Sequence, residues 1–169
     1  MNRNIALIAI MMLALGITGC DQKGKNEAAK PAAQAQAQTA LVVPPAEDNR
    51  AWKLYLSNVV KQHMEGIRSS PFMYYLPAED AEDFEEQFNR QRDNVASAVF
   101  RGVLPGNMLA FGSPSSARMA ELIAEAFEGV SSGSMKDVRV LFIGNEEDLE
   151  KVRTAVEPTG ANVVFHQVK

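Results

Sequence analysis

The clearest pattern along the chain is a helical repeat of apolar residues that begins at Asn49. These residues recur at spacings of three, four and seven, which places them on one face of a helix. They are Trp52, Leu56, Val59, Val60, Met64 and Ile67. Residues 68–71 are expected to end this helix, because the residue before Pro71 avoids the helical region. The aromatic residues 72–76 then lie between two prolines and predict a short edge strand.

A second helix is predicted from Pro77, because a proline followed by the acidic Glu79 and Asp80 suits a helix start. We expect it to end at Gly102, since residues 105–107 (Pro-Gly-Asn) are typical of a turn. Its buried side is expected to comprise Phe84, Phe88, Val95, Val99 and Phe100.

The last third of the chain alternates short apolar runs with helical patterns. Residues 108–111, 138–143 and 162–168 are predicted strands, separated by two predicted helices. Strands that alternate with helices favour a parallel sheet, and the apolar residues 140–143 fit a strand covered on both faces. The sequence therefore predicts an α/β fold with a small three- or four-stranded, mainly parallel sheet. Helices pack on this sheet, and the two N-terminal helices complete the core.

A different pattern occupies the first twenty residues. Arg3 precedes an unbroken apolar run, residues 5–15, and small or β-branched residues follow up to Cys20, the only cysteine. This order is that of a secretory signal, and the run is shorter than the roughly 20 apolar residues of a spanning helix. Residues 17–20 (Ile-Thr-Gly-Cys) resemble the lipobox of bacterial lipoproteins. The alternative is an ordinary cleaved signal with a chance cysteine.

The resemblance covers residues 1–20 only, and it implies a membrane anchor. In that family a diacylglyceryl group is attached to the cysteine thiol, a dedicated peptidase cleaves before the cysteine, and in many bacteria the new amino group is also acylated. We therefore expect Cys20 to hold the protein to the bacterial cell envelope. Asp21 resembles the signal that retains enteric lipoproteins in the inner membrane. The periplasmic face of the inner membrane is thus favoured over the outer membrane.

Composition divides the chain into three parts. Residues 1–19 are the predicted signal peptide, residues 20–48 the lipidated cysteine with a flexible tether, and residues 49–169 a single globular α/β domain. The tether is rich in Ala, Gln, Lys and Pro and buries too little apolar surface to offset the entropy of ordering. Because the only cysteine is committed to lipid, the domain must be stabilised by a packed core and not by disulfides.

The charge of the chain argues against nucleic acid as a partner. The first nineteen residues contain one basic residue, Arg3, and no acidic residue, so their removal changes the formal charge from −4 to −5. A mildly acidic protein lacks the basic surface that binds a phosphate backbone. The expected partners are the membrane, through the lipid on Cys20, and another envelope protein.

The main candidate for ligand binding is the turn at residues 112–116 (Gly-Ser-Pro-Ser-Ser), between a predicted strand and a predicted helix. Free N–H groups at such a position hold anions in α/β proteins, which makes Gly112, Ser113, Ser115 and Ser116 a candidate anion-binding turn. The stretch contains neither GxGxxG nor GK[ST], and serines before a helix are usually caps. Capping is favoured, and anion binding stays open.

No other set of residues forms a recognisable catalytic or metal-binding motif. The turn at residues 144–148 is acidic, which would repel a phosphate, and it lacks the alternating oxygen ligands of a calcium loop. His63 lies in an early helix and His166 in the last strand, and no pattern brings them together. No strand-to-helix turn contains a GxSxG nucleophile elbow. The sequence therefore predicts no catalytic residue, no metal site and no cofactor.

Two functions remain open. The first is a membrane-anchored lipoprotein with a non-catalytic, envelope-facing domain for protein binding or envelope assembly. The second is a tethered small-ligand-binding or enzymatic domain that uses the turn from Ser113 to Ser116. A deep pocket at the carboxyl edge of the sheet would support the second, and a convex aromatic patch the first. The aromatic candidates, which at this spacing are more often core, are Trp52, Tyr55, Phe72, Tyr74 and Tyr75.

Overall fold

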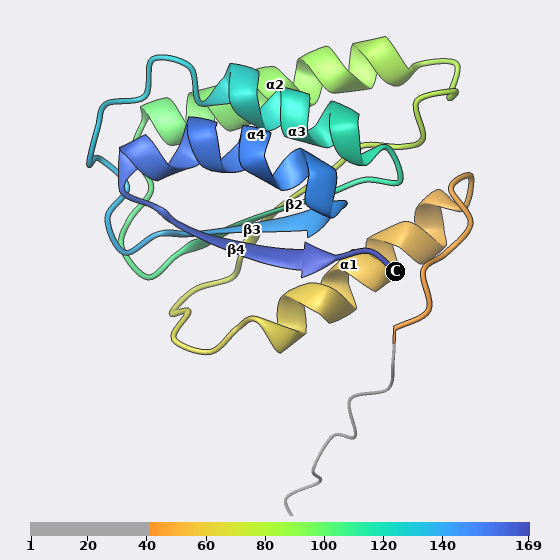
Figure 1. Ribbon diagram of the computed structural model, residues 1–169, viewed down its shortest axis with the longest axis horizontal. Coiled ribbons are helices and arrows are strands. Elements are labelled where there is room, and N and C mark those ends of the chain that lie inside the picture. Colours follow the sequence, from red (N-terminus) through yellow and green to blue (C-terminus); the bar gives the residue numbers. More distant parts are fainter. Residues whose placement is uncertain (1–40) are drawn as a thin grey trace, which may run out of the picture. The chain divides into compact units, whose positions relative to one another are not determined.

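The computed structural model describes residues 41–169, which fold as a four-stranded parallel sheet with helices on both faces (Figure 1). The predicted α/β fold is confirmed. In chain order the elements are α1 (Asn49–Gln62), β1 (Phe72–Tyr75), α2 (Phe84–Phe100), β2 (Met108–Gly112), α3 (Ser116–Ala126), β3 (Arg139–Gly144), α4 (Glu146–Val156), the 3-10 helix η1 (Glu157–Thr159) and β4 (Asn162–Gln167).

The strands lie in the sheet in the order in which they occur along the chain, β1-β2-β3-β4, and each neighbouring pair is parallel. Because every connection moves one strand in the same direction, right-handed crossovers place α2, α3 and α4 on one face. α1 covers the opposite face (Figure 1). The two N-terminal helices thus complete the core from opposite sides. Within residues 41–169 the strand order never reverses, so this sheet has no topological switch point of the kind that binds ligands in many α/β proteins.

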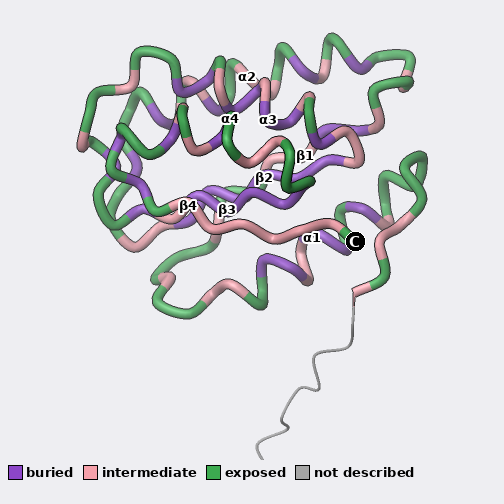
Figure 2. The backbone as a smooth tube through the Cα atoms, viewed as in Figure 1, coloured by how far each residue is buried: buried purple, intermediate pink, exposed green. Residues whose placement is uncertain are grey.

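Alternate residues of the strands bury two apolar clusters, one on each face of the sheet. In β2, Leu109 and Phe111 face the layer of three helices, while Met108 and Ala110 face α1. All five residues of β2 are buried, and β3 is buried from Val140 onward (Figure 2). This two-sided burial is what the apolar run at residues 140–143 predicts.

α1 ends at Gln62, so the expectation that its apolar stripe extends through Met64 and Ile67 was wrong. Gly66 adopts a φ of +77°, which turns the chain away from the helix axis. The guanidinium of Arg139, at the start of β3, donates to the free carbonyls of His63 and Glu65. A cation at a helix C-terminus also complements the helix dipole. The end of α1 therefore depends on a residue that is distant in the sequence.

The other boundaries differ from the predictions by smaller amounts. α2 begins at Phe84, because residues 79–83 form turns and a bend, and not the first helical turn expected after Pro77. Leu41 and Val43 pack against the cluster under α1, ahead of the predicted domain start at Asn49.

The predicted signal peptide, Cys20 and most of the predicted tether lie in residues 1–40, outside the described residues. No helix within residues 41–169 combines the length and the hydropathy that crossing a membrane requires.

Candidate functional site

The turn at residues 112–116 connects β2 to α3 at the carboxyl edge of the sheet, where the strands end. Ser113 is 1% exposed, and its Oγ accepts the N–H of Ser115 (2.9 Å) and donates to the carbonyl of Pro77 (3.3 Å). The Oγ of Ser115 accepts the N–H of Glu79 (2.9 Å). These two hydroxyls therefore fasten the turn to the loop that follows β1.

Ser116 connects the same turn to the start of α4. Its Oγ donates to Oδ2 of Asp148 (2.6 Å) and accepts the N–H of Asn145 (2.8 Å). Ser115 and Asn145 occupy the N-cap positions of α3 and α4, but neither side chain makes a capping hydrogen bond. The serines thus join separate loops instead of capping α3. An anion at this turn would approach the carboxylate of Asp148, which opposes its binding electrostatically.

Ser116→Ala is expected to lower the free energy of unfolding by about 1–3 kcal/mol, because the carboxylate of Asp148 and the N–H of Asn145 both lose a partner. Urea unfolding measures this loss, and Ser134→Ala, which removes an exposed hydroxyl, is the control. In a deletion strain, the Ser113→Ala, Ser116→Ala double variant should restore function in proportion to its folded amount. Unchanged stability together with lost function would instead identify the turn as a functional site.

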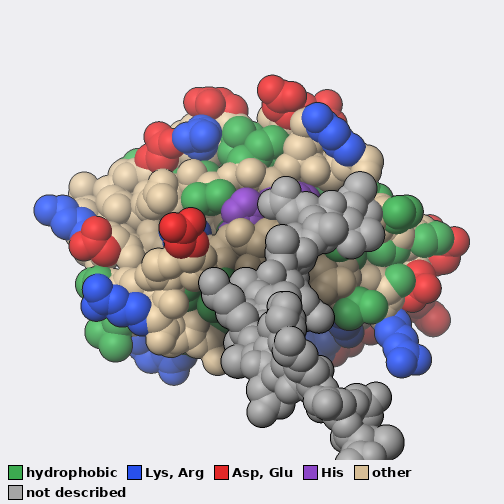
Figure 3. All heavy atoms as spheres, turned by 90° about the horizontal axis from the view of Figure 1, so that it is seen from below, with side chains coloured by type: hydrophobic (Ala, Val, Ile, Leu, Met, Phe, Trp, Pro, Cys, Tyr) green, Lys and Arg blue, Asp and Glu red, His purple; other side chains and the backbone are tan. Residues whose placement is uncertain are grey.

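His63 and His166 are neighbours, which corrects the expectation that nothing brings them together. Nε2 of His63 lies 3.4 Å from Nδ1 of His166, and the two rings are nearly perpendicular, with an interplanar angle of 86°. His63 follows the last residue of α1, and His166 lies in β4, an edge strand of the sheet. The apolar periodicity of a helix or a strand describes one segment at a time. It therefore does not predict the contact between His63 and His166. Histidine side chains are visible at the surface on this face of the protein (Figure 3).

Burial lowers the pKa of both histidines below the ordinary value of 6.5. The positive charge of Arg139 lowers the pKa of His63 further, and His63 does the same to His166. Both imidazoles are therefore neutral at pH 7. In the described part of the chain, no three His, Cys, Asp or Glu side chains lie close enough together to hold a metal ion.

Acid is expected to destabilise the protein through this pair. Because the folded-state pKa values are depressed, the unfolded chain takes up protons first as the pH falls. The histidine contribution is fully present above about pH 6.5 and is lost as the pH falls from there through the folded-state pKa values. Urea unfolding between pH 7.5 and pH 5 measures the decrease, which should be shallower in His166→Gln. An identical pH dependence in that variant would contradict the assignment.

The candidate recognition aromatics are mostly part of the core. Trp52 and Tyr55 are 2% and 5% exposed, and Tyr74 and Tyr75 are half-buried. The hydroxyl of Tyr75 donates to Oδ1 of Asn49 (2.7 Å), and burial raises the pKa of Tyr75 to about 12, so the donor proton is retained at neutral pH. Of the five aromatics, Phe72 alone is exposed.

Exposed apolar side chains occur along β1, at the end of α2 and just after it. In β1, Phe72 is 46% and Met73 is 44% exposed, and the strand (Phe-Met-Tyr-Tyr) contains no charge. Phe100 and Leu104 are 76% and 74% exposed. α2 runs back toward the amino edge of the sheet, where β1 begins. Burial raises the pKa of Tyr74 in β1, and the positive charge of Arg101, which follows α2, partly offsets this increase. We call Phe72 and Met73 the β1-edge surface.

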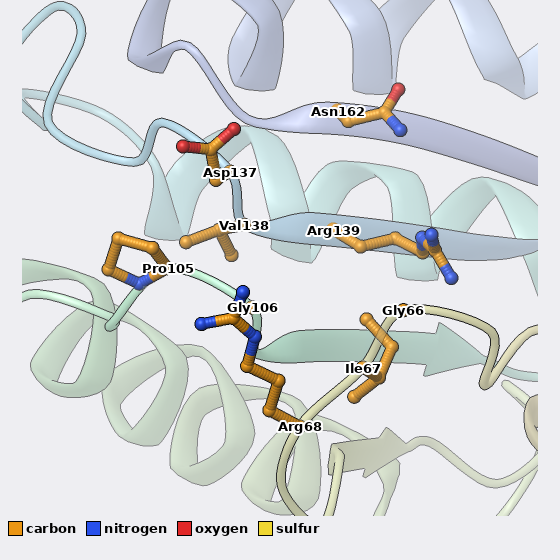
Figure 4. Close-up of a pocket in the computed structure, with 9 residues that line it drawn as sticks. All are labelled: Gly66, Ile67, Arg68, Pro105, Gly106, Asp137, Val138, Arg139 and Asn162. Atoms are coloured by element: carbon orange, nitrogen blue, oxygen red, sulfur yellow. The ribbon is translucent and has the colours of Figure 1, made fainter.

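A hollow of about 560 Å³ lies at the amino edge of the sheet, opposite the serine turn. Arg68 lines it from residues 66–68, and Asp137 and Arg139 line it from residues 137–139, with their charged groups pointing in different directions (Figure 4). This hollow therefore does not provide the pocket at the carboxyl edge that a ligand-binding turn from Ser113 to Ser116 would use.

No protein-family model matches the chain, and no curated protein and no solved structure is significantly similar to it.

Proposed function

We propose that the protein is a membrane-anchored bacterial lipoprotein whose α/β domain binds another envelope protein and performs no catalysis. The lipobox-like residues 17–20 support the anchor. In this proposal the acyl chains are attached to Cys20. Stable anchoring takes more than one acyl chain, which the doubly acylated thioether of this family supplies. Asp21 favours the periplasmic face of the inner membrane.

The observation that carries the binding role is the exposed, uncharged edge strand β1. Its outer side is paired with no other described strand, and its Phe72 and Met73 are about half exposed. Proteins commonly protect such edges with charged residues, and β1 has none. An edge of this kind accepts an extended segment of a partner, which gains backbone hydrogen bonds and side-chain contacts together.

The limits of this edge are also visible. Pro71 and Pro77 flank β1, and the side-chain amide of Gln91 approaches the carbonyl of Tyr75 (3.5 Å). The open part of the strand therefore comprises Phe72, Met73 and Tyr74. We infer that the partner contributes a short, apolar, extended segment and not a long strand.

The internal bonding of the serine turn supports a non-catalytic role. The hydroxyls of Ser113, Ser115 and Ser116 all have partners within the fold, and neither His63 nor His166 is hydrogen-bonded to a serine. A hydrolase needs a nucleophile within hydrogen-bond reach of its base. Among the described residues no serine is hydrogen-bonded to a histidine, and the Ser116 hydroxyl that donates to Asp148 also accepts the N–H of Asn145 inside the fold, so binding is the better supported role.

Crosslinking in intact cells tests the binding role. A photoreactive amino acid placed at Met73 is expected to capture one discrete envelope protein, identified by mass spectrometry. The same amino acid at Leu54, which is 62% exposed on α1, is the matched control and should not capture it. Phe72→Lys should weaken capture from position 73, because it places a charge at the proposed contact. Equal adducts from positions 73 and 54, or none from position 73, would contradict the proposal.

A further inference from the structure

The spacing of the two histidine nitrogens is unusual for a direct hydrogen bond. Nε2 of His63 and Nδ1 of His166 lie 3.4 Å apart, whereas N–H donors commonly lie about 2.7–3.2 Å from their acceptors. Two nitrogen ligands of a tetrahedral Zn²⁺, each about 2.0–2.1 Å from the ion, lie about 3.3–3.4 Å from each other. The observed spacing therefore matches two ligands of one ion.

Both histidines are held in place by structure that does not depend on an ion. The carbonyl of His63 accepts from Arg139, and the backbone of His166 lies opposite Ile143 in the ladder between β3 and β4. The ring of Tyr55 contacts that of His166 at a centroid distance of 6.4 Å. Each imidazole is partly exposed, so water and an ion can reach the two nitrogens.

We propose that His63 and His166 bind a divalent transition-metal ion of the Zn²⁺ type, with water completing its coordination. Imidazole nitrogen is a good ligand for such ions. No third His, Cys, Asp or Glu of residues 41–169 joins them, and the positive charge of Arg139 lies near His63. The site is therefore open and binds more weakly than a closed structural zinc site.

The bound ion joins the end of α1 to β4. Its expected effect is to stabilise the packing of α1 on the sheet, since it binds only when both elements are in place. β4 and β1 are the opposite edge strands, so this inference does not depend on the proposed binding role of the β1-edge surface.

Trp52, the only tryptophan, reports on this site. Its ring contacts Tyr55 at 5.5 Å, and Tyr55 in turn contacts His166. Cu²⁺, which prefers the same ligands and quenches tryptophan at short range, is therefore the optical substitute for Zn²⁺. The full-length protein in detergent micelles should show saturable quenching by Cu²⁺ at pH 7.5 and none by Mg²⁺. Zn²⁺ should raise its thermal unfolding midpoint.

Histidine variants test whether the ion binds at His63 and His166 or at another group of the protein. His166→Gln and His63→Gln should each weaken the Cu²⁺ affinity at least about tenfold and remove the Zn²⁺ shift. Gln167→Ala, which changes the neighbouring residue of β4, should preserve both effects. Either histidine variant can serve if the other fails to fold, as judged by its Trp52 emission and metal-free midpoint. The same Cu²⁺ and Zn²⁺ responses in folded histidine variants, or none in the wild type, would overturn the proposal.

Discussion

Gly144→Ala is expected to lower the free energy of unfolding by about 3 kcal/mol or more. A Cβ at this position would lie 2.5 Å from Oγ of Ser116 and 2.6 Å from Cζ of the fully buried Phe142. The added methyl group therefore strains the core and displaces the hydroxyl that joins α3 to α4. The backbone cannot easily move away, because the carbonyl of Gly144 accepts the N–H of Val168 (2.9 Å).

Gly112→Ala is the matched control for this effect. Gly112 ends β2 as Gly144 ends β3, and the closest atom to its added Cβ is Cδ2 of Leu56, the end of a flexible side chain. Rotation of Leu56 relieves that contact, so we expect a smaller loss of about 1 kcal/mol. Equilibrium unfolding in urea gives both values. An equal or larger loss in Gly112→Ala would contradict the role given to Ser116 and Phe142.

Cys20→Ala is expected to abolish the lipid anchor entirely. The thiol is the acceptor of the diacylglyceryl group in lipoproteins, and each buried CH₂ contributes about 0.8 kcal/mol to membrane binding. We expect this variant to accumulate as uncleaved precursor or as a misprocessed form. Cell fractionation with immunoblotting measures its size and location. Normal processing and membrane attachment of Cys20→Ala would contradict the anchor.

Asp21→Asn is the control for the anchor. It leaves the thiol of Cys20 in place, so lipidation and membrane attachment should persist. If Asp21 retains the protein in the inner membrane, the variant should move toward the outer-membrane fraction. Loss of all membrane attachment in Asp21→Asn would show that the Cys20→Ala effect is not specific to the thiol.

The elements and the fold class could be predicted because their signals are local. The apolar run of β3 and the short aromatic stretch of β1 each correspond to an observed strand, one central and one at the edge. The alternation of strand and helix predicts parallel pairing, and right-handed crossovers then leave few arrangements. The sequence predicted a parallel sheet but not the order of its strands, because the choice of neighbouring strands depends on contacts in three dimensions.

The features that the sequence did not predict all depend on contacts between distant segments. Arg139 of β3 donates to the carbonyls of His63 and Glu65 just beyond the end of α1, and the apolar spacing that continues to Ile67 gives no sign of this. His63 and His166 meet because the end of α1 lies close to β4 in the folded domain. Ser116 belongs to a turn that resembles a cap, but its partner Asp148 lies in the first turn of α4. Gly66 is the one local signal that could have corrected the end of α1.

Mass spectrometry of the mature N-terminus tests the central claim most directly. Wild-type protein purified from bacterial membranes should begin at Cys20 and carry a diacylglyceryl thioether, with or without an acyl group on the new amino terminus. This result would establish that the α/β domain is presented from a membrane by a lipid. A mature protein cleaved at another position and free of lipid would contradict the proposed anchor.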